Sequence, residues 1–227
     1  MMTRNETYRH QIQRVQAVLF DMDGTLVDTD DVVVTALAKR LRPLLGKHAA
    51  SFARWLVMQI ETPGNAFITL LDALHVDELW RSVTAGSRPS QTHTFQLIPG
   101  VEEMILRVAR KYQVGIVTTR GRKEIDAFLA QYPAFGRVVA VTMGREDTRR
   151  LKPHPAPVRE AAAKLALLPE QCVMVGDTTV DVRSGCKAGA WTVGVLCGFG
   201  QERELWRCGA HAVLASTAEL ADFLLTN

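Results

Sequence analysis

Long hydrophobic runs are absent from the 227-residue sequence. No stretch of about 18 consecutive apolar residues occurs, and a membrane-spanning helix needs that length, so we expect no span and no membrane partner. The segment from Met1 to Arg14 is polar and lacks the apolar stretch of a secretory signal peptide. We therefore expect a surface segment before the first strand of a cytoplasmic protein.

Cysteine is scarce and the charge is nearly balanced. The four cysteines, Cys172, Cys186, Cys197 and Cys208, show no Cys-x-x-Cys spacing, so we expect reduced, packed side chains, with zinc or a disulfide as the alternative. The formal net charge of +3 is too small to indicate nucleic-acid binding by itself. Apolar residues make up 47%, which excludes a disordered chain and allows a sizeable core. The oligomeric state, monomer or homodimer, stays open.

Two kinds of hydrophobic pattern divide the chain. Apolar residues between Asp30 and about Gly86 recur at helical spacing, with no convincing strand among them. The segment 86–90 is a linker by composition, and from Pro99 short apolar strands alternate with helices. We therefore predict an α/β core of residues 1–29 and 97–227 and an inserted all-helical cap of residues 30–96, which could hinge as a lid.

The alternation in the core predicts a Rossmann-like, doubly wound parallel sheet covered by helices on both faces. In such sheets the ligand binds at the carboxyl ends of the strands. Strands are expected at 16–20, 114–118, 138–141, 172–175, 191–195 and 212–214. Helices are expected to open near 101 and to cover 123–130, 156–167, 180–188 and 217–225, the last capped by Ser216.

The segment Asp21-Met22-Asp23-Gly24-Thr25 follows the first predicted strand directly. Alternate residues of an extended segment point the same way, so Asp21 and Asp23 should project together from the strand end. Gly24 allows a sharp turn because it lacks a Cβ atom. Paired acids repel each other, share a proton or hold a cation, and the remaining acids of the chain decide between these.

Three further groups of polar residues lie at or after strand ends. Thr118 ends one strand and Thr119 follows it, and both offer hydroxyl donors. Lys152 lies in a loop that prolines stiffen. Asp177 follows a later strand, and Asp181 lies in the first turn of the next helix, where the helix dipole favours an anion.

Up to four aspartates in one crevice are unstable without a cation. Hard oxygen ligands with room for water indicate Mg²⁺, which binds carboxylates together with substrate phosphate. The lysine and the threonines supply the charge and the donors that a phosphoryl group needs. A carboxylate can also attack phosphorus and form an aspartyl phosphate. The pattern therefore predicts Mg²⁺-dependent chemistry on a small phosphate ester.

These motifs resemble those of the haloacid dehalogenase-like hydrolase superfamily, in its phosphatase branch with a helical cap. The resemblance is carried by Asp21 to Thr25, then Thr118, then Lys152, then Gly176 to Asp181, in the family's order. It covers nearly the whole chain after about Val15. The tail, with Gly194-Val195-Leu196-Cys197-Gly198-Phe199-Gly200, resembles the phosphoglycolate phosphatase-like group.

The resemblance implies a role for each site residue. Asp21 is expected to attack phosphorus, and Asp23 to protonate the departing oxygen and then activate water. Mg²⁺ is expected on the Asp21 carboxylate, the Asp23 main-chain carbonyl and Asp177, with Asp181 as a further ligand or as the residue that orients a bound water. Thr118 and Lys152, with Thr119 as a partial replacement for the family's usual asparagine, are expected to hold the phosphoryl oxygens.

Arg120 and Arg122 make the mouth of the predicted site basic. We favour a solvated helix start and loop for them, and the alternative is a substrate with a second anionic group. Two other functions stay open: a phosphomutase of the same superfamily, and a non-catalytic binding or regulatory module on this fold. Phosphoglycolate, a sugar phosphate, a nucleotide and pyrophosphate all remain candidate substrates.

Overall fold

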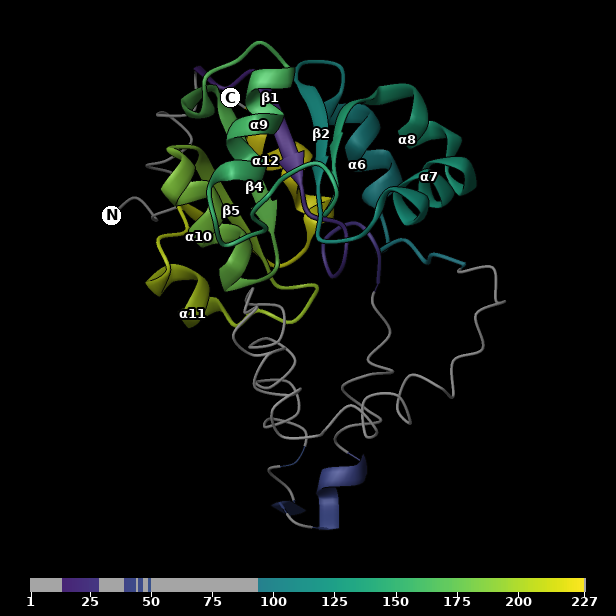
Figure 1. The fold of residues 1–227 in the computed structure, drawn as a ribbon, viewed down its shortest axis with the longest axis vertical. Helices are drawn as coiled ribbons and strands as arrows, with labels where there is room; N and C mark the ends of the chain where they lie inside the picture. Colours follow the sequence, from purple (N-terminus) through teal and green to yellow (C-terminus); the bar gives the residue numbers. More distant parts are fainter. Residues whose placement is uncertain (1–13, 29–38, 44, 47–48, 50–93, 227) are drawn as a thin grey trace.

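The computed structural model describes residues 14–28, 39–43, 45–46, 49 and 94–226. Within these residues the core is a six-stranded sheet in which every neighbouring pair of strands is parallel. Helices cover the sheet on both sides (Figure 1). The predicted α/β class with a doubly wound parallel sheet is confirmed.

The order of the strands across the sheet is β3-β2-β1-β4-β5-β6. The chain thus builds outward from β1 in one direction and then, from β4, in the other, which places a topological switch point between β1 and β4. The strands are β1 (Ala17–Phe20), β2 (Gln113–Val117), β3 (Val139–Met143), β4 (Cys172–Gly176), β5 (Trp191–Val195) and β6 (Ala212–Leu214).

The core contains a helix at each expected position and two additional helices, α8 and α11. Proline is favoured in the first turn of a helix, and Pro133 begins α8, so the following strand starts one residue later than expected. The helices are α6 (Val101–Val108), α7 (Arg122–Gln131), α8 (Pro133–Val138), α9 (Ala156–Lys164), α10 (Thr179–Ala188), α11 (Glu202–Arg207) and α12 (Leu220–Leu225), with two 3₁₀ turns, η3 (Pro169–Gln171) and η4 (Thr217–Glu219).

Two expected helices end differently in the structure. α9 stops at Lys164, three residues before the expected end, and Ala166 beyond it has a positive φ of 58°. The last expected helix is divided into η4 and α12, and Ser216 caps its start by accepting a hydrogen bond from the Ala218 N–H, as predicted.

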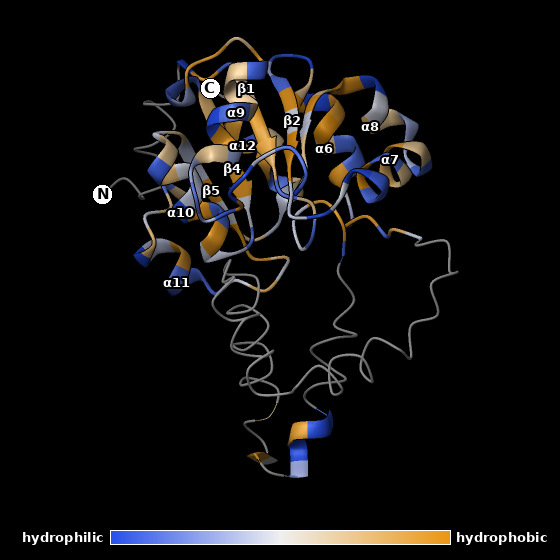
Figure 2. Ribbon diagram, in the orientation of Figure 1, coloured by the Kyte–Doolittle hydropathy of each residue, from blue (hydrophilic) through white to orange (hydrophobic). Residues whose placement is uncertain are grey.

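The sheet divides the hydrophobic core into two layers. Successive side chains of a strand point to opposite faces, so Val18 and Phe20 pack on one side of β1, and Ala17 and Leu19 pack on the other. The first layer is covered by α6 and α12 and the second by α9. Figure 2 shows the hydrophobic strands inside and hydrophilic residues on the outer helices.

The two chain segments that lead to residues 30–96 run side by side at the edge of the core. Val27 and Leu97 form an antiparallel bridge. The Asp28 N–H donates to the Gln96 carbonyl at 2.7 Å, and the Ile98 N–H donates to the Leu26 carbonyl at 3.1 Å. Backbone hydrogen bonds therefore join the two connections of the predicted cap to each other.

The predicted cap lies largely outside the described residues. Residues 39–43 are helical, in agreement with the helical periodicity there. Among the helices that the structure describes, none combines the length and the apolar character that crossing a bilayer requires.

Candidate active site

Polar side chains gather where β1, β2 and β4 end. Asp21 follows β1, Thr118 follows β2 and Asp177 follows β4. The Asp21 N–H donates to the Val175 carbonyl at 2.9 Å, so the pairing of β1 with β4 continues past the end of β1. Since β1 lies between β2 and β4, this register brings the three residues to the same edge of the sheet, at the switch point.

Three of the predicted metal ligands form one buried cluster. Asp21, Asp177 and Asp181 each offer a carboxylate oxygen, and these oxygens lie within 4.8 Å of one another. All three side chains are buried. Closely spaced hard oxygen donors suit Mg²⁺ or a similar divalent cation, so the residues present fit the predicted ion.

Lys152 supplies the positive charge of this cluster. Its Nζ atom lies 2.7 Å from Asp21 Oδ1 and 2.6 Å from Asp181 Oδ1, and the side chain is only 3% exposed. Burial alone would lower the pKa of Lys152, but the carboxylates of Asp181 and Asp21 outweigh burial and raise it. The lysine therefore stays protonated and bridges two of the acids.

The crowded negative charges act most clearly on the pKa of Asp21. Burial raises its pKa well above the ordinary value, and the neighbouring carboxylates of Asp181, Asp177 and Asp23 raise it further, against the lowering effect of Lys152. One lysine is thus insufficient to neutralise the cluster. A bound cation would favour the ionised form of Asp21.

Asp177 accepts hydrogen bonds from one hydroxyl and one backbone donor, and neither contact was predicted from the sequence. The Thr25 hydroxyl donates to Oδ1 at 3.2 Å, and the Phe199 N–H donates to Oδ2 at 2.8 Å. The loop after β5 approaches so closely that a Cβ atom on Gly198 would lie 2.1 Å from Asp177 Oδ2. The glycines of this tail, which carried a family resemblance, therefore have a packing reason.

Asp181 is oriented from both sides. Lys152 donates to its Oδ1, while the Thr178 N–H and hydroxyl donate to its Oδ2 at 3.1 and 2.6 Å. Thr178 is the N-cap of α10, so the hydrogen bonds that begin the helix also fix the carboxylate. One oxygen of the cluster is thereby preorganised by local helix chemistry.

Asp23 differs from the other acids because its carboxylate is paired with Arg120. The Arg120 Nε and Nη2 atoms donate to Asp23 Oδ2 and Oδ1, each at 2.7 Å. Arg120 is 22% exposed. The favoured interpretation of a solvated helix start is therefore wrong for Arg120. The residue is an internal partner of a predicted catalytic acid.

The two threonines after β2 have different surroundings. Thr118 is buried, and its hydroxyl oxygen accepts a hydrogen bond from the Arg120 N–H at 3.2 Å, which leaves its own proton to donate. Thr119 is exposed, and its predicted role in substrate binding stays a prediction. Arg122 lies on α7 and pairs with Asp147 and Thr142.

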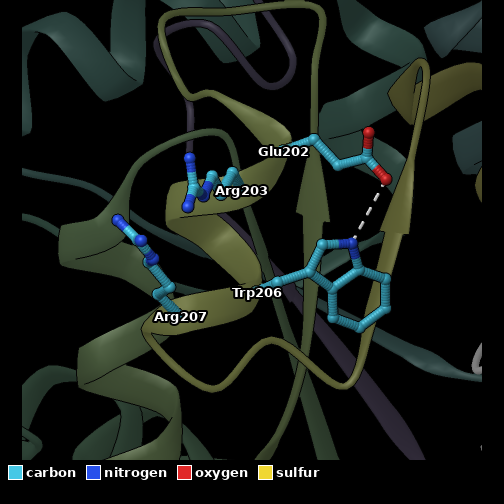
Figure 3. A pocket seen from close by; sticks show the side chains of 4 residues that line it. All are labelled: Glu202, Arg203, Trp206 and Arg207. Carbon is cyan, nitrogen blue, oxygen red and sulfur yellow. Dashed lines mark hydrogen bonds between the residues drawn. The ribbon is translucent and has the colours of Figure 1, made fainter.

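A shallow hollow lies elsewhere on the surface, over α11. Glu202, Arg203, Trp206 and Arg207 line it, and the Trp206 Nε1–H donates to Glu202 at 3.3 Å (Figure 3). None of these residues belongs to the carboxylate cluster. The chemistry of the described residues is therefore concentrated at the ends of β1, β2 and β4.

A doubly wound parallel sheet with acids and a lysine at its switch point defines an α/β enzyme core. A family model described as haloacid dehalogenase-like hydrolase matches residues 18–195. The Pyrophosphatase PpaX of Bacillus cereus (strain AH820) is 31% identical over 189 residues, which cover 80% of this chain and 83% of the relative. The chain belongs to the haloacid dehalogenase-like hydrolase family, and the predicted family and enzyme class are confirmed.

Solved structures share the fold. A haloacid dehalogenase-like family hydrolase from Streptococcus pneumoniae has a TM-score of 0.69 at 20% identity, over 92% of this chain and 98% of that chain. A β-phosphoglucomutase candidate from Thermotoga maritima has a TM-score of 0.66 at 21% identity, over 92% and 98%. At these identities the likeness shows the fold alone.

Proposed function

We propose that the protein is a Mg²⁺-dependent phosphatase that hydrolyses a small phosphomonoester through an aspartyl phosphate on Asp21. The observation that carries the proposal is the buried cluster of Asp21, Asp177 and Asp181 with Lys152 at 2.6–2.7 Å. The name of the relative PpaX, a pyrophosphatase, supports phosphoryl chemistry of this kind.

In the first step an oxygen of Asp21 attacks phosphorus, and the bond from phosphorus to the ester oxygen breaks. The departing oxygen takes a proton from Asp23, and the alcohol leaves. The proposed products of this step are the alcohol and an aspartyl phosphate on Asp21. Lys152, already 2.7 Å from Asp21 Oδ1, is placed to neutralise charge on the transferring group.

In the second step water attacks the phosphorus of the aspartyl phosphate. Asp23 takes a proton from this water, and the bond from phosphorus to the Asp21 oxygen breaks. Inorganic phosphate leaves, and the Asp21 carboxylate is restored. Thr118, whose hydroxyl proton is left to donate, and Thr119 are the proposed donors to the phosphoryl oxygens.

Asp21, Asp177 and Asp181, with the main-chain carbonyl of Asp23, are the proposed ligands of Mg²⁺. The bound ion supplies charge neutralisation for the acids and for the phosphoryl group. The raised pKa of Asp21 supports this proposal, because a cation beside the carboxylate favours the ionised, nucleophilic form.

We assign residues 1–29 and 97–227 to the catalytic core and residues 30–96 to a helical cap that selects the substrate. The paired connections around Val27 and Leu97 support this division. Among the candidate substrates, pyrophosphate gains support because the relative PpaX is named a pyrophosphatase. We also propose that the enzyme is cytoplasmic and acts on a small soluble ester. Its proposed partners include neither nucleic acid nor a membrane.

A phosphomutase of the same superfamily is the second candidate, because a structural neighbour is a β-phosphoglucomutase candidate. The two functions differ in what attacks the aspartyl phosphate: water in a phosphatase, and a sugar hydroxyl in a mutase. A non-catalytic module is disfavoured by the buried cluster of three acids and by the contacts of Lys152 with two of them.

The test is a phosphatase screen of the purified full chain. The panel contains p-nitrophenyl phosphate, phosphoglycolate, hexose phosphates, nucleoside monophosphates and pyrophosphate, each with Mg²⁺ and with EDTA, and Asp21→Asn as the blank. We expect phosphate release that requires Mg²⁺ and Asp21. Full-speed hydrolysis in EDTA or by Asp21→Asn would contradict the mechanism, and conversion of a sugar phosphate to its isomer without phosphate release would favour the mutase.

A further inference from the structure

The guanidinium of Arg120 holds both carboxylate oxygens of Asp23. Nε donates to Oδ2 and Nη2 donates to Oδ1, each at 2.7 Å. This two-point geometry fixes the carboxylate in its plane as well as in its position, which a single hydrogen bond does not.

Arg120 is itself held by three other groups. Its Nη1 donates to Glu124 Oε1 at 3.1 Å. Its guanidinium carbon lies 5.3 Å from the centre of the Phe95 ring, within the range of a cation–π contact. Its main-chain N–H donates to the Thr118 hydroxyl at 3.2 Å. The arginine is therefore a fixed support and not a mobile surface side chain.

The local sequence builds this support. Gly121 is the N-cap of α7, and Glu124, at the third position of that helix, accepts the Gly121 N–H at 3.0 Å. The same carboxylate pairs with Arg120 through its other oxygen. The start of α7 thus fixes Glu124, Glu124 fixes Arg120, and Arg120 fixes Asp23.

The charges around Arg120 argue against a role in binding a second anionic group of the substrate. Two carboxylates, Asp23 at 2.7 Å and Glu124 at 3.1 Å, already neutralise the guanidinium. An incoming anion would have to displace one of them. Arg122, the other arginine of this segment, is paired with Asp147.

We propose that Arg120 is a positioning residue that holds the Asp23 carboxyl group where the proposed mechanism needs it. The inference rests on the proposed function, because it gives Asp23 a reason to be held. A proton passes efficiently only between atoms at hydrogen-bonding distance. If the Asp23 carboxyl group is not held in place, kcat should therefore fall while KM stays nearly unchanged. In this proposal the Arg120 side chain acts on the reaction through Asp23.

The test compares two esters in Arg120→Ala, Arg120→Lys and Asp23→Ala. The leaving group of p-nitrophenyl phosphate departs without a proton, whereas that of glycerol phosphate needs one. We expect Arg120→Ala to lower kcat for glycerol phosphate by about 10- to 100-fold, part of the effect of general acid–base catalysis, and by a smaller factor for p-nitrophenyl phosphate, with KM nearly unchanged. Lysine cannot bind both oxygens in the same way, so Arg120→Lys should restore little of the rate.

A double-mutant cycle separates this role from a general structural one. In an Asp23→Ala background, removal of Arg120 should cause no further loss for glycerol phosphate. Arg122→Ala is the matched control, since it removes a neighbouring arginine whose partner is Asp147, and its kcat ratio for the two esters should equal that of the wild type. Thermal unfolding checks every variant, and Arg120→Gln replaces Arg120→Ala if the alanine variant does not fold.

No loss of kcat for glycerol phosphate, a further loss in the Asp23→Ala background, or a gain in rate would each overturn the inference. If the wild type is active and Asp23→Ala is impaired while Arg120→Ala behaves like Arg122→Ala, the inference fails and the proposed function stands. If the wild type hydrolyses no ester, or Asp23→Ala is fully active, the proposed function fails and the inference fails with it.

Discussion

The Lys152 ammonium lies 2.6 Å from Asp181 Oδ1, although the two residues come from a loop before α9 and from the first turn of α10. The same ammonium lies 2.7 Å from Asp21 Oδ1. A single buried cation therefore joins the proposed nucleophile to a residue of the proposed metal site. Through these two contacts Lys152 helps to hold both carboxylates in place.

Lys152→Met should destabilise the metal-free protein. The change leaves the buried carboxylates of Asp21 and Asp181 without their cation, and breaking a buried ion pair in this way costs about 3–5 kcal/mol. Urea unfolding in EDTA measures the loss, and Mg²⁺ should restore more stability to the variant than to the wild type. Lys187→Met, at an exposed position, is the control and should change stability by less than about 0.5 kcal/mol. A Lys152→Met protein as stable as this control would refute the assigned role.

Gly198→Ala should weaken metal binding. A Cβ atom at this position would lie 2.1 Å from Asp177 Oδ2 and 2.7 Å from the Gly24 carbonyl, so the loop or the carboxylate must move. Disturbing a group that orients a metal ligand typically costs about 10- to 100-fold in metal affinity. Calorimetric titration with Mg²⁺ or Mn²⁺ measures this directly, without reference to turnover.

Gly136→Ala is the matched control for that substitution, because its Cβ atom would meet only the Leu129 carbonyl at 3.5 Å, an ordinary contact. We expect wild-type metal affinity for it. Equal affinities of the two alanine variants would show that the close approach at Gly198 does not position Asp177.

His211 should make stability depend on pH, away from the active site. Its Nδ1 atom accepts the Thr192 N–H at 3.1 Å, which requires the neutral ring, and burial lowers its pKa. Because the pKa in the folded state lies below that in the unfolded state, the contribution is present above the unfolded value of about 6.5 and is lost as the pH falls through the folded value.

The measurement is urea unfolding of the wild type and His211→Gln between pH 8 and pH 5. The wild type should lose more stability on acidification than the variant. Parallel pH profiles for the two proteins would contradict the role of His211.

Phe128→Ala should be strongly destabilising. Phe128 is fully buried, and its ring lies 5.6 Å from that of Phe95 and 5.0 Å from that of Phe135, measured between centroids. Loss of a buried phenylalanine typically costs about 3–5 kcal/mol in unfolding free energy. Leu168→Ala, at a side chain that is 59% exposed, is the control and should cost far less in the same denaturation experiment. Similar losses for the two variants would show that the aromatic cluster is not a core element.

Much of the core fold could be predicted because its signals are local. Short apolar runs between turn residues mark all six strands, and alternating strands and helices fix the parallel class. α8 and α11 escaped prediction because each is six residues long, too short for a periodic pattern to develop. α12 is equally short, but it was predicted as one segment together with η4. The end of α9 depends on the left-handed conformation of Ala166, an unusual one for a residue with a Cβ atom, so its sequence gave no warning.

The sequence by itself determined which residues are candidates for carrying the chemistry. Asp21, Asp23, Thr118, Lys152 and Asp177 all lie at strand ends or in the loops that follow, and strand ends are visible in an apolar pattern. The spacing of Asp21 and Asp23 also predicted a pair of acids that project together from the end of the strand. Their roles as ligands, nucleophile and acid remain proposals.

Only the tertiary structure decided how those residues pair. Asp23 and Arg120 are separated by 97 positions, and Thr25 and Asp177 by 152, so no local pattern reports that they touch. Parallel strands bring distant segments together through the register of the sheet, and side-chain partners depend on that register. The sequence therefore identified the four acids. The fold brings Asp21, Asp177 and Asp181 together in one cluster and pairs Asp23 with Arg120.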